Sequence, residues 1–233
     1  MRQIAATVVA ALLPAAMASA AQEFWPEIDG FFPIDPTTRL SVMAASTRAE
    51  ESDQEDGQWR RSDLQLGAHL DFTLQPMLRP ALAAQDWERR RFLWMRVGYR
   101  HIGSFPAGAD RYGENRGVVE LSAHHPLEGG WALNGRLKWD LRDVDGNYSN
   151  RYRARAGVER EVRIGALSTT PYADVEVFYD TRFDAWNRQR YQLGIDVPAA
   201  AHWTVEPYLA WQQDSRSQPG EIFALGLTLK YSH

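Results

Sequence analysis

The feature that most constrains this chain is an alternation of apolar and polar residues that recurs in long segments. Over residues 63–74 the apolar positions are Leu64, Leu66, Ala68, Leu70, Phe72 and Leu74. The polar or small residues between them are Asp63, Gln65, Gly67, His69, Asp71 and Thr73. Successive side chains of a β-strand point to opposite faces, so this period of two predicts strands with one apolar and one polar face.

The same pattern marks about eleven candidate strands along the chain. They cover residues 24–32, 39–48, 63–74, 91–102, 116–124, 131–142, 151–163, 169–180, 188–197, 204–213 and 222–231. A soluble β-sandwich also alternates, but its strands usually have only ~5–6 residues. Here the segments are long enough to cross a bilayer as tilted strands, which takes ~9–11 residues, and many carry aromatic residues near their ends. The prediction is an all-β fold, a single transmembrane antiparallel up-and-down β-barrel of about 10 to 12 strands.

The strand number is left open because single-chain bacterial barrels generally have an even count. Residues 24–32 are alternatively a partial strand or a periplasmic N-terminal segment. A twelfth strand is the other alternative, within residues 76–90, where Pro and Trp obscure the pattern.

The first twenty residues read as an export signal. Arg2 precedes an apolar stretch from Ile4 to Met17, and Ala18-Ser19-Ala20 is a small-residue cleavage site. No later segment has the roughly 18 consecutive apolar residues of a membrane helix, and the mean hydropathy is −0.46. We therefore expect residues 1–20 to be cleaved, residues 21–233 to form the barrel domain, and the protein to reside in the cell outer membrane of a Gram-negative bacterium.

Composition excludes several other functions. Loss of Arg2 with the signal changes the formal net charge from −4 to −5, and the charges are spread along the chain, which argues against a nucleic-acid partner. Cysteine is absent, so thiolate metal sites and disulfides are excluded. Residues 143–147 are reminiscent of a calcium loop but lack its glutamate at the twelfth position, and are better interpreted as an Asp-Gly turn. No metal or cofactor is predicted.

Connection lengths predict an orientation, because outer-membrane barrels have long extracellular loops and short periplasmic turns. Residues 50–61, 103–114, 143–150, 181–187 and 214–220 are predicted to be extracellular. Residues 126–130 and 199–202 are predicted to be periplasmic turns. The connection 75–90 would also be periplasmic, although it is too long for a turn.

Charged residues fill the polar faces of the later strands and should therefore line the lumen. The predicted lumenal charge network consists of Arg136, Lys138, Arg153, Arg155, Glu159, Asp174, Glu176, Arg188 and Arg190. A charge in such a place needs water or a partner, which allows two interpretations. Either carboxylates neutralise the arginines in cross-strand ladders and the barrel is closed, or excess arginines form a narrow path for small anionic solutes.

A third alternative is a lipid-modifying hydrolase. Glu120, Ser122 and His124 share one face of a strand, but residues two apart lie ~6.6 Å apart along it, so a direct contact between serine and histidine needs favourable rotamers. No catalytic residue is assigned, and the protein is predicted to be non-enzymatic.

Several segments resemble one bacterial family, called domain of unknown function 2490. They are Trp25-Pro26-Glu27, DLQLGAHLDF, GYRHIG, NRGVVEL, NRYRARAGVERE and, most specifically, PYADVEVFYDTRFDAWNRQRYQLGI. The resemblance implies an outer-membrane barrel of proteobacterial type, without an established substrate or catalytic residue. Its partners would be outer-membrane lipids and the barrel-assembly machinery, which commonly recognises a terminal aromatic residue in the last strand. This chain departs from that pattern with His233.

Overall fold

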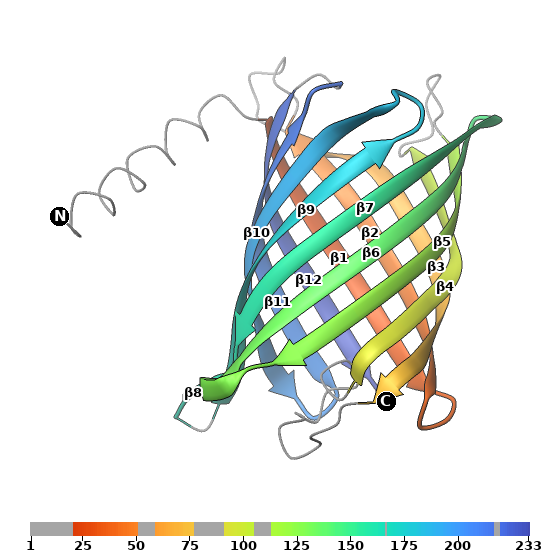
Figure 1. Cartoon of the computed structure of the whole chain (residues 1–233). Coiled ribbons are helices and arrows are strands. Elements are labelled where there is room, and N and C mark those ends of the chain that lie inside the picture. Colours follow the sequence, from red (N-terminus) through yellow and green to blue (C-terminus); the bar gives the residue numbers. More distant parts are fainter. Residues whose placement is uncertain (1–20, 51–58, 77–90, 105–112, 166, 217–219) are drawn as a thin grey trace.

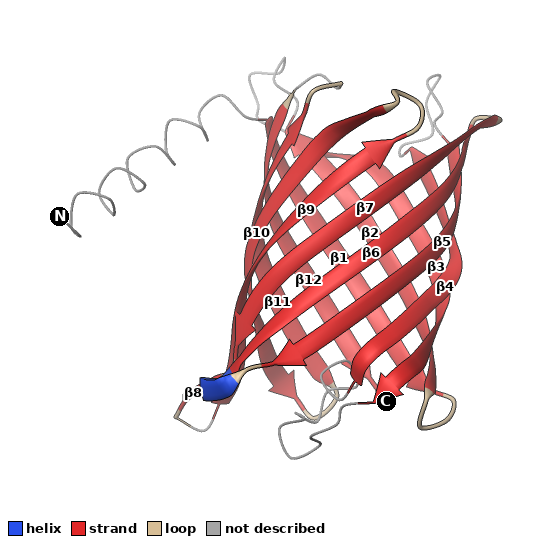
Figure 2. Cartoon of the chain, in the orientation of Figure 1, coloured by secondary structure: helices blue, strands red, loops and turns tan. Residues whose placement is uncertain are grey.

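The computed structural model describes residues 21–50, 59–76, 91–104, 113–165, 167–216 and 220–233. Within these ranges eleven long strands form one closed barrel, in which each strand pairs with the next (Figure 1). They are β1 (Ala21–Pro33), β2 (Thr38–Glu50), β3 (Trp59–Pro76), β4 (Arg91–Ser104), β5 (Gly113–Pro126), β6 (Trp131–Val144), β7 (Asn147–Arg160), β9 (Leu167–Asp180), β10 (Ala185–Ala200), β11 (Trp203–Asp214) and β12 (Glu221–Ser232). The short β8 (Val162–Ile164) pairs with the start of β9, and the 3₁₀ turn η2 (Glu128–Gly130) joins β5 to β6 (Figure 2).

Ten of the eleven predicted segments lie within a single strand each. The segment 151–163 was wrong in one respect, because β7 ends at Arg160 and β8 begins at Val162. The Glu161 N–H leaves the ladder and donates to the carbonyl oxygen of Gly130 at 2.8 Å. The alternative twelfth strand and the predicted signal both fall outside the described residues, which omit 77–90 and 1–20.

The barrel closes through one parallel strand pair. All other neighbouring strands are antiparallel, but β1 and β12 pair in parallel from Ala21 opposite Ile222 to Phe31 opposite Ser232. This follows from the odd count, since in an up-and-down barrel of eleven strands the first and last strands run the same way. The sheet is thus antiparallel, as predicted, at every strand pair except this one. The first and last residues of the barrel domain lie at opposite rims (Figure 1). The backbone N–H of His233 extends the closure by donating to Phe31 O at 3.1 Å.

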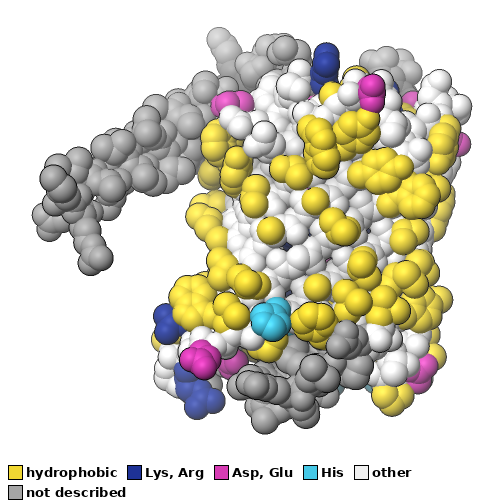
Figure 3. Space-filling model, in the orientation of Figure 1, with side chains coloured by type: hydrophobic (Ala, Val, Ile, Leu, Met, Phe, Trp, Pro, Cys, Tyr) yellow, Lys and Arg dark blue, Asp and Glu magenta, His cyan; other side chains and the backbone are white. Residues whose placement is uncertain are grey.

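Burial along the strands is inverted relative to a soluble protein. On β6 the apolar Leu133 and Leu137 are 48% and 60% exposed, whereas the alternating Lys138 and Asp140 are 4% and 0% exposed. The apolar parity thus faces outward and the charged parity faces the lumen, as the alternation predicted. Figure 3 shows the resulting hydrophobic side chains spread over the outer wall. Among the described residues, no helix is long and apolar enough to span a membrane.

Aromatic residues gather near both rims of the outer wall. Towards one rim, rings contact one another across four strands through Trp139, Tyr152, Tyr179 and Trp186, with centroids 5.6–6.3 Å apart. Towards the opposite rim, Tyr231 packs against Trp203 at 5.1 Å. Two such girdles, separated by an apolar band, are typical of membrane barrels, where amphipathic rings lie at the headgroup level.

The strand order assigns every connection to one of two rims. The described strand ends that flank the five connections predicted to be extracellular all lie at the rim where β1 begins, and both predicted periplasmic turns lie at the rim where β12 ends. Pro76 and Arg91, which flank the doubtful connection, pair at the same rim as the turns.

Two of the turns use aspartate chemistry. Asp145 and Gly146 have φ values of 50° and 81° between β6 and β7, which is the two-residue hairpin turn that Asp-Gly favours. At the other rim Asp35 Oδ1 accepts hydrogen bonds from the backbone N–H groups of Thr37 and Thr38 at 2.7 and 2.9 Å. These bonds and that from the Thr37 hydroxyl hold the pKa of Asp35 below its usual range. The φ values of Asp145 and Gly146 confirm the Asp-Gly turn that was predicted within residues 143–147.

Candidate functional site

One carboxylate organises the lumenal face of β6, β7 and β9. Glu176 is 0% exposed, and it accepts hydrogen bonds from Arg136 Nη2 at 2.8 Å and from Arg153 Nη2 at 2.6 Å. Arg155 Nη2 lies 3.8 Å from the same carboxylate, and Arg155 Nη1 lies 3.4 Å from Asp174. These residues were predicted to share the lumen, and the structure joins them in a cross-strand ladder.

A second group of ion pairs lies closer to the rim where β1 begins. Arg142 donates to Glu114 Oε1 at 2.6 Å and to Asp180 Oδ2 at 2.9 Å, and Arg151 Nη2 donates to Asp180 at 2.7 Å. Arg116 Nε also donates to Glu114 at 2.8 Å. Because each charge has a partner within hydrogen-bond distance, this part of the wall satisfies the requirement for buried ions.

The other predicted network residues have separate partners. Lys138 Nζ lies 3.8 Å from both Glu120 and Asp140, and Arg188 Nη2 lies 2.5 Å from Asp214. Glu159 does not join the ladder. Its carboxylate lies 3.3 Å from His124 Nε2, without hydrogen-bond geometry.

Arg190 and Arg100 form no ion pair with a carboxylate of the described chain. Arg190 donates to Gln212 Oε1 at 2.6 and 3.0 Å, and its guanidinium carbon lies 4.7 Å from the centre of the Trp25 ring. Arg100 Nε donates to His69 Nε2 at 3.2 Å. Both side chains line the lumenal cavity. They are therefore the cations most available to a solute.

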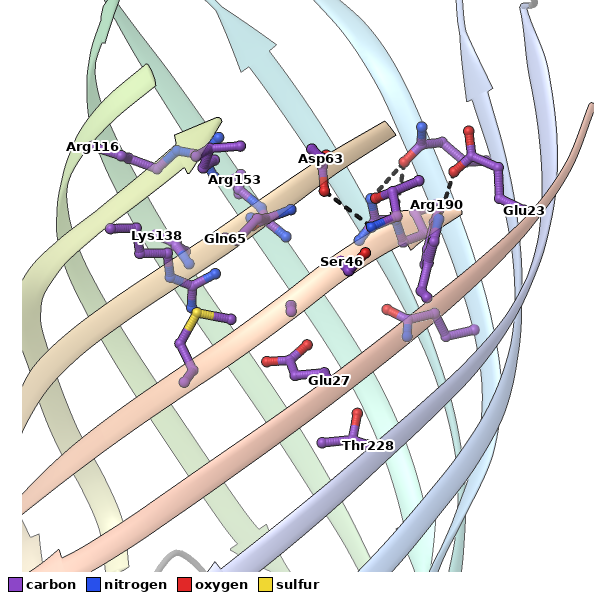
Figure 4. Close-up of a pocket in the computed structure, with 18 of the residues that line it drawn as sticks. Glu23, Glu27, Ser46, Asp63, Gln65, Arg116, Lys138, Arg153, Arg190 and Thr228 are labelled. Carbon is purple, nitrogen blue, oxygen red and sulfur yellow. Dashed lines mark hydrogen bonds between the residues drawn. The ribbon is translucent and has the colours of Figure 1, made fainter. Parts of the chain in front are cut away.

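That cavity has a volume of about 640 Å³ (Figure 4). The described residues around it include ten cationic side chains: Arg100, Arg116, Arg136, Lys138, Arg142, Arg151, Arg153, Arg155, Arg188 and Arg190. They also include six carboxylates: Glu23, Glu27, Asp29, Asp63, Glu114 and Glu206. Six of the nine predicted network residues thus line it, whereas Glu159, Asp174 and Glu176 do not. Eight of these ten cations form ion pairs with carboxylates that do not line the cavity, namely Glu120, Asp140, Asp174, Glu176, Asp180 and Asp214, so the positive charge of the lining is largely neutralised.

The two signs of charge are segregated around the barrel. Three of the six carboxylates, Glu23, Glu27 and Asp29, come from β1. Six of the ten cations come from β6 and β7. Both strands lie five strands from β1 around the barrel. β6 is reached in one direction, after β2, β3, β4 and β5, and β7 is reached in the other, after β12, β11, β10 and β9. The acidic strand therefore faces the basic pair across the lumen, as Figure 1 shows with β1 behind β6 and β7.

The residues of the hydrolase alternative all face the lumen but do not form a catalytic pair. Ser122 Oγ donates to Glu120 Oε1 at 3.3 Å, and within the described chain no hydrogen bond joins Ser122 to His124. His124 is directed instead towards Glu159. A nucleophile needs its base within hydrogen-bond reach, and this arrangement does not supply it.

The comparisons with known proteins place the chain in a family. The family model described as "Protein of unknown function (DUF2490)" matches residues 25–222. The chain belongs to the DUF2490 family. The resemblance inferred from the motifs is thereby confirmed. None of the curated proteins compared with this DUF2490 chain matches it.

Three solved structures are similar to this DUF2490 chain. LpxR from Salmonella typhimurium superimposes with a TM-score of 0.52 at 10% identity, over 84% of this chain and 83% of LpxR. The beta domain of the Bordetella autotransporter Brka gives a TM-score of 0.47 at 12% identity, over 84% and 82%. An anion-selective porin from Comamonas acidovorans gives 0.36 at 13% identity, over 83% and 55%. At these identities the likeness to LpxR shows the barrel fold alone.

The structure of this DUF2490 barrel also contains a charge cluster that the sequence reasoning did not assign. Asp71, which is 0% exposed, accepts hydrogen bonds from Arg39 Nε at 2.7 Å and from Arg96 Nε at 2.6 Å. The alternation of residues 63–74 and 91–102 places Asp71 and Arg96 on the lumenal faces of adjacent predicted strands. This parity was the sequence signal that could have revealed their ion pair. Glu114, assigned to a loop, continues the parity of Arg116 and Glu120 in β5.

Proposed function

We propose that this DUF2490 chain resides in the outer membrane of a Gram-negative bacterium and forms a narrow channel for small anionic solutes. The observation that carries the proposal is a pair of cavity-lining arginines, Arg100 and Arg190, that form no ion pair with a carboxylate of the described chain. In a lumen of low dielectric, an excess of fixed positive charge attracts anions and repels cations. Guanidinium groups also bind carboxylate and phosphate through paired hydrogen bonds.

The path we propose differs in part from the one suggested by the sequence. Arg136, Arg153 and Arg155 are held by Glu176 and Asp174, so they belong first to the wall of the barrel. Arg100 and Arg190 face the same cavity and have no carboxylate partner in the described chain. The closed, salt-bridged alternative thus describes the wall of β6, β7 and β9, and the solute path is assigned to the cavity in front of it.

Ion selectivity tests this assignment. The refolded barrel in a planar bilayer, under a KCl gradient, should show a reversal potential that is shifted from zero towards the equilibrium potential of chloride. Replacing both arginines, Arg100→Gln and Arg190→Gln, removes the two lining guanidinium groups that have no carboxylate partner and should move the reversal potential towards zero. The control is Arg163→Gln, because Arg163 is an exposed arginine of β8 outside the cavity. A cation-selective wild type, or a potential that the double variant leaves unchanged, would contradict the proposal.

The proposal is of a protein without catalytic activity. It is supported by the geometry of Ser122, which donates to Glu120 rather than to His124. Lipase and deacylase activity of the refolded protein should be indistinguishable from that of a Ser122→Ala variant and of protein-free detergent. Lipid hydrolysis that requires Ser122 would restore the hydrolase alternative.

A further inference from the structure

The acidic side of the lumen carries groups that no protein contact explains. Glu23, Glu27 and Asp29 occupy alternate, lumenal positions of β1, and all three line the cavity. Glu23 accepts a hydrogen bond from Trp25 Nε1 at 2.5 Å. Glu27 and Asp29 form no hydrogen bond or ion pair with any described residue, although the cavity holds ten cationic side chains. A simple anion path would have no use for them, since they repel its solute.

A polar group that lacks a partner lies beside these carboxylates. Thr228 is in register with Glu27 on β1 and with Glu206 on β11. It is only 5% exposed, it lines the cavity, and its hydroxyl forms no hydrogen bond with a described residue (Figure 4). A hydroxyl that faces a cavity without a protein partner can donate to and accept from a ligand or water there.

Aromatic rings frame the same region of the wall. One row of lumenal residues across the sheet reads Tyr172, Gly194, Tyr208, Gly226 and Trp25, each in register with the next. The Tyr208 ring lies flat over Gly226, where an added Cβ would come within 1.9 Å of the ring. Tyr208 and Trp25 both line the cavity, one lumenal position from Glu27. Carboxylates beside aromatic rings are the surroundings that bind ammonium groups.

The opposite requirement, an anion site, is met by a free arginine of the same cavity. Arg190 stacks on Trp25, which holds its guanidinium at the boundary between the acidic and basic walls. Arg100, the other arginine without a carboxylate partner, comes from β4 on the opposite side of the barrel. A volume of about 640 Å³ is in the range of small-molecule sites, which is roughly 300–1,000 Å³.

We propose that the solute of this lumen is dipolar: a small zwitterion with a carboxylate at one end and an ammonium group at the other. Its carboxylate binds Arg190, and its ammonium group binds Glu27, Asp29 and the Thr228 hydroxyl. Arg190 and the carboxylates of β1 together complement both ends of such a molecule, whereas a simple anion is attracted by Arg190 and repelled by Glu27 and Asp29. The inference rests on the channel proposed above and changes its solute from a simple anion to a molecule whose carboxylate is accompanied by an ammonium group.

The test uses three probes that share a four-carbon chain and differ in charge: 4-aminobutyrate, butyrate and butylammonium. Binding to the refolded barrel in detergent is measured by titration calorimetry, which does not depend on conduction. The zwitterion should bind at least tenfold more tightly than either singly charged probe. In the double variant Glu27→Gln, Asp29→Asn its affinity should fall to that of butyrate. The variant should fold, because both carboxylates lack partners in the described chain.

The matched control is Asp143→Asn, which removes an exposed carboxylate of β6 that has no described partner, and it should leave the zwitterion's affinity unchanged. Butyrate that binds as tightly as 4-aminobutyrate would overturn the inference in favour of a plain anion site. Butylammonium that binds best would overturn it in favour of a cation site, and so would the failure of all three to bind. Conductance of the same sample separates the two proposals, since a conducting barrel without dipolar preference contradicts only the present one.

Discussion

Replacing Glu176 with glutamine should destabilise the barrel by about 3–5 kcal/mol, the cost of removing one partner from a buried ion pair. Glu176 is fully buried and neutralises Arg136 and Arg153 at 2.8 and 2.6 Å. Glutamine keeps the shape and one acceptor but removes the charge, so the guanidinium groups remain in the wall with only longer contacts, such as that of Arg153 to Asp140 at 3.8 Å. The measurement is denaturant unfolding of the barrel in lipid vesicles, followed by tryptophan fluorescence.

Two comparisons make this result specific to the ladder. Asp143→Asn removes the same charge from an exposed position and should change stability by less than about 0.5 kcal/mol. Adding Arg153→Gln to Glu176→Gln removes one stranded cation and should recover part of the loss, a coupling that a double-mutant cycle measures. Equal effects of Glu176→Gln and Asp143→Asn would show that the ladder does not stabilise the wall.

Gly98→Ala should destabilise the β3–β4 pair by about 3 kcal/mol, at the upper end of what overpacking usually costs. A Cβ at Gly98 would lie 2.4 Å from the carbonyl oxygen of Ala68 and 2.7 Å from the Cα of His69. Both contacts are with the backbone of the neighbouring strand, so relief requires the two strands to separate. The effect should appear as a lower denaturant midpoint and as a lower yield of the folded form on gels without heating.

Two other glycines provide the matched controls. At Gly117 the nearest atoms to an added Cβ belong to Leu141 at 3.6 Å, an ordinary contact, so Gly117→Ala should be close to neutral. At Gly226 the clash is with the end of the Tyr208 side chain, which borders the cavity and can swing into it. Gly226→Ala should therefore cost less than Gly98→Ala. If the Gly98→Ala and Gly117→Ala variants unfold at the same denaturant midpoint, the description of a close contact between β3 and β4 at Gly98 is wrong.

Much of the fold could be predicted from the sequence because alternate residues of a membrane-barrel strand face lipid and lumen. In segments such as 63–74 and 131–142, the surroundings of each face differ as much as lipid and water do, so alternation locates the strand and its inner face. Parity does not specify which strand the first one pairs with. The parallel closure of β1 on β12 depends on the strand number, which a single ambiguous segment can change by one.

The candidate site was less predictable, because it depends on distances across the barrel. Arg153 and Glu176 lie on adjacent predicted strands, so their pairing could be anticipated from parity alone. The acids of β1 could not be related to the arginines of β6 and β7 in this way, since only the closed barrel places them opposite each other. Parity also gave no sign that Arg190 would stack on Trp25, which is far away in sequence.

The most direct test of the whole account is single-channel recording of the refolded barrel, residues 21–233, in planar bilayers. A lumen with an open cavity and free arginines should give small, steady conductance steps, and 4-aminobutyrate added to the bath should reduce them by occupying the cavity. A correctly folded barrel that remains electrically silent would contradict the channel and leave the arginine-carboxylate ladder as a purely structural core.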